Sequence, residues 1–446
     1  MANAVEDFVN HVQNLSSQGQ FSVLCDYMNK TWSSLIKINA SLLDTILEAL
    51  DLQEHSLGIM YVLCIKVNAV TNQTSMEDFE QIFSQLSLFV SQCTTEQIRY
   101  SSGNFAQMFH TITAELCRRS MSLRGIKLLS MAIEKLQTHS SQLTSIHADL
   151  CQLCLDAKCL RPAFKFLDIE ISEIAKENGM FDAKHFLSYY YYGGMIYSCM
   201  KNFSRSLYFF EQAISCPATT VSFIMLESYK KYSLVSLILE GRFVSLPKYT
   251  SQVITRFIKP FTSEYNELVQ AYMTNDPVKL NAVVTNHRNV FMSDSNLGLI
   301  KQVAVSLNKR NIQRLTKTFI TLSLSDVALR ACISNAEEVE IQLREMIENH
   351  EIFATIDQES QMVNFHDDPE GYNSSEMLNK MDKDIQNFME LDRKMKEMSE
   401  LIQVNPTYLQ KVKNVSSQDD DFDGGLLGSA SSSTSRSSLL SKLMFK

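Results

Sequence analysis

The sequence predicts an all-α chain in which an irregular solenoid of helix pairs precedes a small module of three short helices with a β-hairpin and then one long helix. Three features of the pattern predict this order. Apolar residues recur at spacings of three and four through the first 300 residues, the spacing falls to two between residues 352 and 365, and a last helical stripe spans residues 377 to 402. At 446 residues, 45% of them hydrophobic, the chain is long enough for two or three packed units.

Residues 1–300 repeat the pattern of a helix with one buried face. The stripe is clearest in a run of six apolar residues, Phe79, Ile82, Phe83, Leu86, Phe89 and Val90. The segments between such stripes are short and polar, as at Lys201 and Asn202, so consecutive helices should fold back as antiparallel pairs. Pairs of this kind bury their apolar faces by stacking on their neighbours, which makes a solenoid.

One helix pair matches the spacing of a tetratricopeptide repeat (TPR). Small and aromatic residues occupy the expected positions between residues 187 and 217, namely Gly194, Tyr197, Ser206, Phe210 and Ala213. The small residues let two helices approach closely while the aromatic rings fill the space between them. Pro217 closes the pair one residue early, and a weaker copy passes through Ala157, Ala163 and Leu167. The other pairs match poorly, so we expect an irregular, TPR-like repeat region.

Residues 301–367 predict three short helices in a row. The first should span Asn311–Thr321, the second should run from a Ser323 cap with Asp326 through Arg330, and the third should begin at Asn335 with Glu338. Serine and asparagine start helices because their side chains accept hydrogen bonds from free backbone N–H groups.

A hairpin should follow these helices. Its apolar residues alternate with polar ones on either side of the turn Gln358–Gln361, and they are Ile352, Ala354, Ile356, Val363 and Phe365. Three helices with a terminal hairpin make a winged helix. The exposed edge of such a hairpin can extend a sheet into a neighbouring subunit.

A long helix is expected over residues 374–404, ending at Pro406. Its apolar stripe consists of Met377, Met381, Ile385, Phe388, Leu391, Met395, Met398 and Ile402. The helix either packs on its own domain or joins a bundle with other subunits. We favour the bundle, because about 39 Å of stripe exceeds one winged-helix face and methionine adapts to unlike partners. Residues 414–446 are acidic and serine-rich, so we expect a disordered tail whose serines could be phosphorylated.

Composition narrows the function classes. A net charge of -9 argues against binding to phosphates or anionic membranes, and the segment 310–366 holds five basic residues against nine acidic ones. A winged-helix nucleic-acid adaptor is therefore a poor alternative. The longest apolar stretch, Gly58–Ile65, is far shorter than the roughly 20 residues that cross a bilayer. Ten scattered cysteines without an apolar signal segment favour free thiols in the cytoplasm or nucleus.

The sequence offers no convincing catalytic, cofactor or metal site. His147, Cys151, Cys154 and Cys159 have helical spacing that could in principle bind a metal, but a buried helix face with small thiols is the favoured interpretation. No two of the nine histidines are separated by a single residue, so a His-x-His zinc motif is absent. We predict a protein that is not an enzyme and needs no cofactor.

The order of parts, together with several short segments, resembles the PCI family of the proteasome lid, the COP-9 signalosome and translation initiation factor three. The matching segments are 322–330 (LSLSDVALR), 339–340 (VE), 346–347 (MI), 352–358 (IFATIDQ) and 363–365 (VNF). Four others, 143–151 (LTSIHADLC), 189–195 (YYYYGGM), 226–232 (LESYKKY) and 311–319 (NIQRLTKTF), are similar to the signalosome's third-subunit family.

This resemblance implies a scaffold role. Residues 200–300 would be the helical part of the PCI domain, 301–367 its winged-helix part, and the partners would be other signalosome subunits and, indirectly, cullin-RING ligases. The signalosome strips a ubiquitin-like modifier from cullins, and the resemblance implies that this isopeptidase chemistry belongs to another subunit. A subunit of the proteasome lid or of initiation factor three is the alternative with the same architecture.

Overall fold

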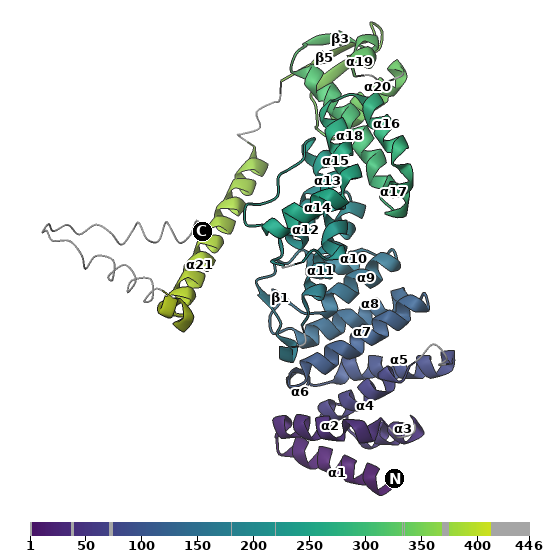
Figure 1. Cartoon of the computed structure of the whole chain (residues 1–446), viewed down its shortest axis with the longest axis vertical. Helices are drawn as coiled ribbons and strands as arrows, with labels where there is room; N and C mark the ends of the chain where they lie inside the picture. The colour runs from purple at the N-terminus through teal and green to yellow at the C-terminus, as the bar shows by residue number, and fades with distance from the viewer. Residues whose placement is uncertain are drawn as a thin grey trace, which may run out of the picture. The chain divides into compact units, whose positions relative to one another are not determined.

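The computed structural model describes residues 2–36, 40–70, 75–179, 181–218, 220–331, 333, 335–367 and 374–411 (Figure 1). The chain divides into two compact units, Met1–His366 and Asp367–Lys446. The first unit contains helical repeats that lead into a winged-helix module, and the second contains one long helix. This predominantly helical order is the one that the sequence predicts. The acidic tail at 414–446 lies outside the described residues.

The first unit begins with a long series of helices. In chain order they are α1 (Ala2–Ser17), α2 (Phe21–Leu35), α3 (Ala40–Ala49), α4 (Ser56–Asn68), α5 (Met76–Gln92), α6 (Thr95–Arg99), α7 (Ser102–Arg118), α8 (Ser122–Leu136), α9 (Ile146–Asp156), α10 (Arg161–Leu167), α11 (Ala183–Cys199), α12 (Phe203–Ser215), α13 (Phe223–Glu240), α14 (Gln252–Phe261), α15 (Ser263–Met273), α16 (Pro277–Asn286) and α17 (Arg288–Ser293). A short 3-10 helix, η1 (Glu177–Gly179), and two two-residue parallel strands, β1 (Gln142–Leu143) and β2 (Glu173–Ile174), interrupt them.

The predicted TPR pair is present as α11 and α12. Gly194 lies so close to α12 that a Cβ atom on it would be 2.7 Å from the Phe210 ring, and Ser206 Oγ donates to the Gly194 carbonyl at 2.9 Å. Tyr197 and Phe210 are buried. The small residues therefore allow the close approach and the aromatic rings fill the pair, as the spacing predicts.

The apolar stretch Gly58–Ile65 lies in α4, which is buried on all sides between α2, α3, α5 and α7. The stretch is therefore a core helix. None of the helices that the structure describes has the length and hydrophobicity needed to cross a bilayer.

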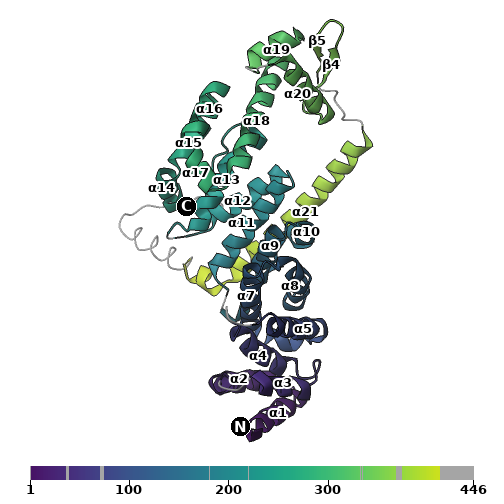
Figure 2. The same ribbon diagram turned by 90° about the vertical axis from the view of Figure 1, so that its right-hand side faces the viewer.

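Helix α13 connects the repeats to the helices that follow them. It packs against α11 and α12 on one side and against α15 and α18 (Leu297–Thr316) on the other, and both views place it between α12 and α18 (Figures 1 and 2). Tyr229 and Val235 belong to the core shared with α12 and α14, whereas Leu234 and Leu237 belong to the core shared with α15 to α18. One helix thus supports two cores.

The winged-helix module contains α18, β3 (Thr321–Ser323), α19 (Leu324–Ala331), α20 (Ala336–Glu348), β4 (Ala354–Asp357) and β5 (Met362–Phe365). Its strands form one antiparallel sheet in the order β3-β5-β4, in which Leu322 pairs with Val363 and Ile356 pairs with Val363 from the other side. The predicted hairpin is confirmed. It is, however, part of a three-stranded sheet, because β3 adds a strand that the sequence analysis did not predict.

Two helix boundaries in this module differ from the prediction. The expected helix Asn311–Thr321 is the last part of α18, which begins at Leu297 and ends at Thr316, and Thr321 belongs to β3. The prediction missed this because the three residues of β3 are too few to establish a period of two. The third helix does begin after Asn335, but the Asn335 side chain makes no capping hydrogen bond, so that cap was wrong.

The second helix starts as predicted. The Asp326 backbone N–H donates to Ser323 Oγ at 3.1 Å, and Ser323 Oγ donates to the Asp326 carboxylate at 2.8 Å. In the hairpin turn, Gln361 has a φ of 51°, the left-handed conformation that glycine adopts most easily.

The second unit contains α21 (Ser375–Val404), where the long helix is predicted. Ser374 Oγ accepts from the Met377 backbone N–H at 3.2 Å and starts the helix. Asn405 interrupts it one residue before Pro406, and residues 406–411 are helical again.

Candidate assembly surfaces

The five apolar hairpin residues hold the winged helix together. Val363, Phe365 and Ile352 are buried and Ala354 and Ile356 are partly buried, in a core shared with α19 and α20. These side chains therefore pack mainly within the module. The surface that the hairpin offers is the backbone of β4, because β5 lies in the middle of the sheet and β4 lies at its edge. No strand in the described chain pairs with the outer side of β4.

The surface of α20 is acidic. Glu337, Glu338, Glu345 and Glu348 are exposed, and Glu340 accepts a hydrogen bond from Gln358 Nε2 in the hairpin turn at 2.8 Å. Several uncompensated carboxylates on the helix that would enter a DNA groove repel phosphates. The exposed surface of α20 is therefore acidic, as its composition predicts.

The apolar stripe of α21 is exposed along its whole length. Seven of the eight predicted residues have exposed fractions between 53% and 70%, namely Met381, Ile385, Phe388, Leu391, Met395, Met398 and Ile402. Met377 is partly exposed, and α21 has no buried residue. Elsewhere on the helix, Lys394 pairs with Glu390 at 2.9 Å and Lys396 with Asp392 at 2.7 Å. One polar side and one continuous apolar side indicate an unfilled helix-packing surface.

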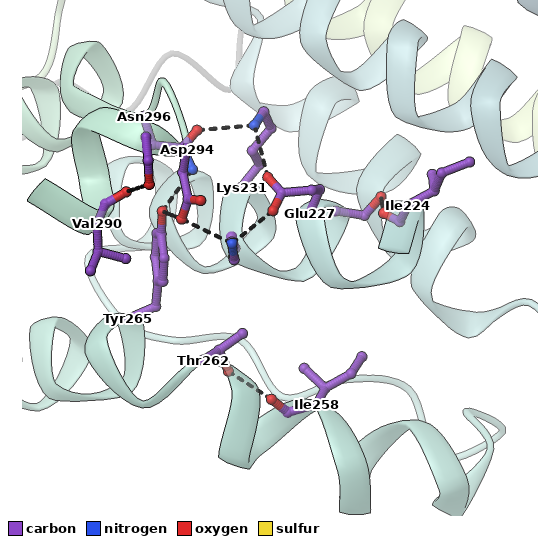
Figure 3. A network of polar contacts seen from close by, with 12 residues as sticks. Ile224, Glu227, Lys231, Ile258, Thr262, Tyr265, Val290, Asp294 and Asn296 are labelled. Carbon is purple, nitrogen blue, oxygen red and sulfur yellow. Dashed lines mark hydrogen bonds and ion pairs between the residues drawn. The ribbon is translucent and has the colours of Figure 1, made fainter. Parts of the chain in front are cut away.

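A buried polar network joins α13 to the segment after α17 (Figure 3). Lys230 Nζ lies 2.7 Å from Glu227 and 2.9 Å from Asp294, and Lys231 Nζ donates to Asn296 Oδ1 at 3.0 Å. Tyr265, on α15, donates to Asp294 at 2.8 Å and accepts from Asn296 Nδ2 at 2.8 Å. Glu227, Lys230 and Lys231 are only 7–8% exposed. Each buried charge therefore has a partner of opposite charge or a hydrogen bond.

The network sets the ionisation of its members. Burial opposes the charged form of Lys230, but hydrogen bonds to Glu227 and Asp294 outweigh it and raise the pKa. Burial lowers the pKa of Lys231, whose nearest carboxylate oxygen, on Glu227, is 3.8 Å away. Burial and the hydrogen bond to Asp294 raise the pKa of Tyr265, so it remains a neutral donor.

Comparison with known proteins gives the family. Residues 18–254 match the model of the N-terminal helical repeats of COP9 signalosome complex subunit 3, and residues 283–367 match the PCI domain. The chain is 42% identical over 437 residues to COP9 signalosome complex subunit 3 of Drosophila melanogaster, which covers 95% of this chain and 97% of that protein. It is 36% identical over 426 residues to the subunit of that name from Arabidopsis thaliana, covering 94% and 97% respectively.

The chain belongs to the COP9 signalosome subunit 3 family.

In this member of the subunit 3 family, the buried network links the two matched regions. Glu227, Lys230 and Lys231 lie in the helical repeats, and Asp294 and Asn296 lie in the PCI domain. The segment 226–232 (LESYKKY), which resembles the family, therefore contributes the repeat side of this joint. This role was not predicted from the sequence, because adjacent lysines ordinarily lie on a solvated surface and the partners of these two follow 64 and 65 residues later.

A serine, a histidine and an aspartate also come together, which no sequence pattern predicted. His110 Nε2 is 3.1 Å from Ser145 Oγ, and His110 Nδ1 is 2.6 Å from Asp149. In a nucleophilic triad the serine hydroxyl donates to the imidazole and faces a substrate. Here Ser145 is fully buried and donates to Glu177 at 2.7 Å, so the cluster joins α7, α9 and η1 and has no access for a substrate.

The candidate metal cluster is a packed helix face. His147 is buried, its Nδ1 lies 2.8 Å from Thr144 Oγ1, and burial lowers its pKa to about 4. Burial raises the pKa of Cys154 to about 12 and raises that of Cys151 well above its usual value. Protonated thiols are poor metal ligands. Within the described residues, no group of three or more His, Cys, Asp or Glu side chains could hold a metal ion.

The nine cysteines that the structure describes form no disulfide with one another, and their redox state stays a prediction. The tyrosine run 189–192 also packs inward, because Tyr189 and Tyr190 are buried and Tyr189 donates to the Phe166 carbonyl at 3.4 Å.

Proposed function

We propose that this chain is a non-catalytic scaffold subunit of the signalosome, the complex that removes a ubiquitin-like modifier from cullins and thereby regulates cullin-RING ubiquitin ligases. The observation that carries the proposal is similarity over nearly the whole chain to relatives named as the third subunit. In this proposal residues 1–300 are the repeat region, 301–367 the winged-helix part of the PCI domain and 374–404 the bundle helix, with a solvated tail at 414–446.

The stripe of α21 is the first assembly surface. Its residues, from Met377 to Ile402, extend over about 39 Å at a rise of about 1.5 Å per residue. Apolar side chains at this spacing are stabilised when a second helix covers them, and methionine adapts to partners of different shape. We therefore propose that α21 joins a bundle of helices from other subunits.

The edge of β4 is the second assembly surface. Its side chains on one face secure the winged helix, so its backbone N–H and C=O groups are held in an extended, rigid arrangement. An extended segment of a neighbouring PCI subunit can pair with such an edge and gain main-chain hydrogen bonds. This mode needs no particular side chain on β4.

The isopeptidase chemistry belongs, in this proposal, to another subunit that carries a His-x-His zinc motif. Paired imidazoles on one segment, with an open position for water, are what a zinc hydrolase requires. No two of the nine histidines of this chain are separated by a single residue. Cullin-RING ligases are thus indirect partners, nucleic acid and membranes are not partners, and the subunit works in the cytoplasm and nucleus.

Purification of the full-length chain from cell extract tests the assignment. We expect signalosome subunits to co-purify in equal amounts, and the purified complex, but not the free chain, to deconjugate a modified cullin. Recovery of proteasome-lid or initiation-factor-three subunits instead would favour the alternative with the same architecture. Metal-dependent cleavage by the free chain would contradict the non-catalytic role.

A further inference from the structure

The apolar side of α21 contains one position that is not apolar. Between residues 377 and 402, the side chains along the middle of this side follow the alternating spacing of four and three that a helix-packing seam requires. The seam positions are Met377, Met381, Asp384, Phe388, Leu391, Met395, Met398 and Ile402. Asp384 therefore lies in the seam itself, and Ile385 lies beside it.

The carboxylate of Asp384 has no partner in the described part of the chain. Its side chain is exposed, and it forms no hydrogen bond or ion pair with any residue that the structure describes. By contrast, Asp392 on the same helix lies 2.7 Å from Lys396. Lys380 comes one turn before Asp384, but a lysine that precedes its acidic partner has the less favourable order on a helix.

This carboxylate becomes important when another helix covers the seam. In the free chain it faces water, whereas an unpaired carboxylate inside a helix interface loses its hydration without compensation. A lysine or arginine on the covering helix, opposite Asp384, restores the balance through a charge-assisted hydrogen bond. A helix that presents only apolar side chains, or that is shifted by one turn, leaves the carboxylate buried and unpaired.

We propose that the helix that covers α21 places a lysine or arginine opposite Asp384, and that this single ion pair fixes the register of the two helices. A polar residue in an otherwise apolar seam specifies register in coiled coils, because only one alignment satisfies it. The inference rests on the assembly role proposed above for α21, and it adds the chemistry of the partner helix and its alignment.

A second copy of this chain in parallel register is a poor partner for the seam. Two α21 helices aligned in that way would bring two Asp384 carboxylates together, and like charges buried side by side repel each other. The seam therefore favours a helix from a different chain, with a basic residue among its apolar ones.

Competition binding with the full-length chain tests the proposal. Each variant competes with fluorescently labelled natural chain for a signalosome reconstituted from the other subunits. Asp384→Asn and Asp384→Leu should each weaken binding at least about tenfold, because the cation of the partner is left buried without its carboxylate. Asp384→Lys should weaken binding at least about a hundredfold, because it places two positive charges together.

Two matched controls on the same helix keep the seam intact. Asp382 lies on another side of α21, where it accepts a hydrogen bond from Gln386 at 2.9 Å, so Asp382→Leu should leave binding unchanged. Lys380→Ala should also leave binding unchanged. An effect of Lys380→Ala as large as that of Asp384→Asn would show that the carboxylate is neutralised within its own helix, and it would overturn the proposal. Circular dichroism of the free variants checks that the fold is kept.

The triple variant Ile385→Asp/Phe388→Asp/Leu391→Asp, in the same assay, separates this inference from the assembly role. If the triple variant fails to bind while Asp384→Asn or Asp384→Leu binds as tightly as the natural chain, α21 is an assembly surface but the ion pair is absent, and the inference is overturned. If the triple variant binds normally, the assembly role fails with it. The inference is also overturned if the free natural chain forms a dimer that the triple variant abolishes, because a second copy then covers the seam.

Discussion

Helices α13 and α21 both reverse the usual distribution of residues, but in opposite directions. In α13, Glu227, Lys230 and Lys231 are 7–8% exposed, although charged residues normally face water. In α21, Phe388 is 70% exposed and Leu391 54%, although large apolar residues normally face a core. The first helix buries charge, and the second exposes apolar surface.

The difference lies in whether the partner belongs to the same chain. The α13 charges find Asp294, Asn296 and each other, so the interaction is complete within the subunit. The apolar residues of α21 have no buried contact, so their interaction is incomplete. A buried, satisfied network indicates an internal joint, and an exposed apolar stripe indicates a surface that awaits a partner.

The largest expected effect comes from placing charge on the α21 stripe. The triple variant Ile385→Asp/Phe388→Asp/Leu391→Asp should leave the free chain folded, because these side chains are exposed. It should be excluded from the reconstituted complex, because each charge buried in a helix bundle costs on the order of several kcal/mol. Size-exclusion chromatography of the complex and circular dichroism of the free subunit measure the two effects.

Two controls sharpen this result. Asn379→Asp/Lys383→Asp/Gln386→Asp adds negative charge away from the stripe, and deletion of residues 414–446 removes the tail, and both should leave assembly intact. If the triple variant assembles normally, the stripe is not an assembly surface. If it unfolds alone, α21 is part of an internal core, and the contrast with α13 disappears.

The next effect should come from breaking the α13 network. Glu227→Gln keeps the shape of the side chain but removes the carboxylate that faces Lys230 and Lys231. Removing one partner of a buried ion pair should lower the free energy of unfolding by about 3 to 5 kcal/mol. Urea denaturation measures the loss. Glu390→Gln, which breaks an exposed pair on α21, is the matched control and should leave the midpoint unchanged. Equal effects of the two variants would contradict the conclusion that the buried network of Glu227, Lys230 and Asp294 stabilises the first unit.

Acid should weaken the first unit through His147. Burial lowers the pKa of His147 from 6.5 to about 4, so between these values the unfolded chain binds the proton more tightly than the folded chain. Its stabilising contribution is fully present above pH 6.5 and is lost as pH falls to about 4, in total about 3 kcal/mol. Urea denaturation across this range should show a steeper loss for the natural chain than for His147→Gln. Parallel curves would count against a buried, neutral histidine.

The smallest effect should come from a pair of glycines in the first unit. In Gly194→Ala the new methyl group meets the Phe210 ring at 2.7 Å, and overpacking should cost about 1 to 3 kcal/mol. Gly298, in α18, has no neighbouring atom within 4 Å, so Gly298→Ala should stabilise the helix by up to about 1 kcal/mol. Thermal unfolding compares the two. If Gly194→Ala is as stable as the natural chain, α11 and α12 are not unusually close.

Local pattern was enough to predict much of the fold. The spacing of Gly194, Tyr197 and Phe210 predicted the α11–α12 pair, the alternation from Ile352 to Phe365 predicted the hairpin, and Ser323 predicted the start of α19. The stripe of α21 was equally plain, although its role as an assembly surface stays a prediction. These features depend on residues a few positions apart, and backbone geometry alone determines which of them share a face.

Only the tertiary structure decided which distant residues meet. β3 pairs with β5, which follows it by some 40 residues. Lys230 donates a hydrogen bond to Asp294, and Ser145 donates one to Glu177. The same structure buries the two lysines of α13 and leaves Phe257 and Phe261 of α14 exposed. The spacing of residues along a helix predicts which of them share an apolar face or a charged face. Whether such a face is buried depends on the helices packed around it, and those contacts form only when the whole chain folds.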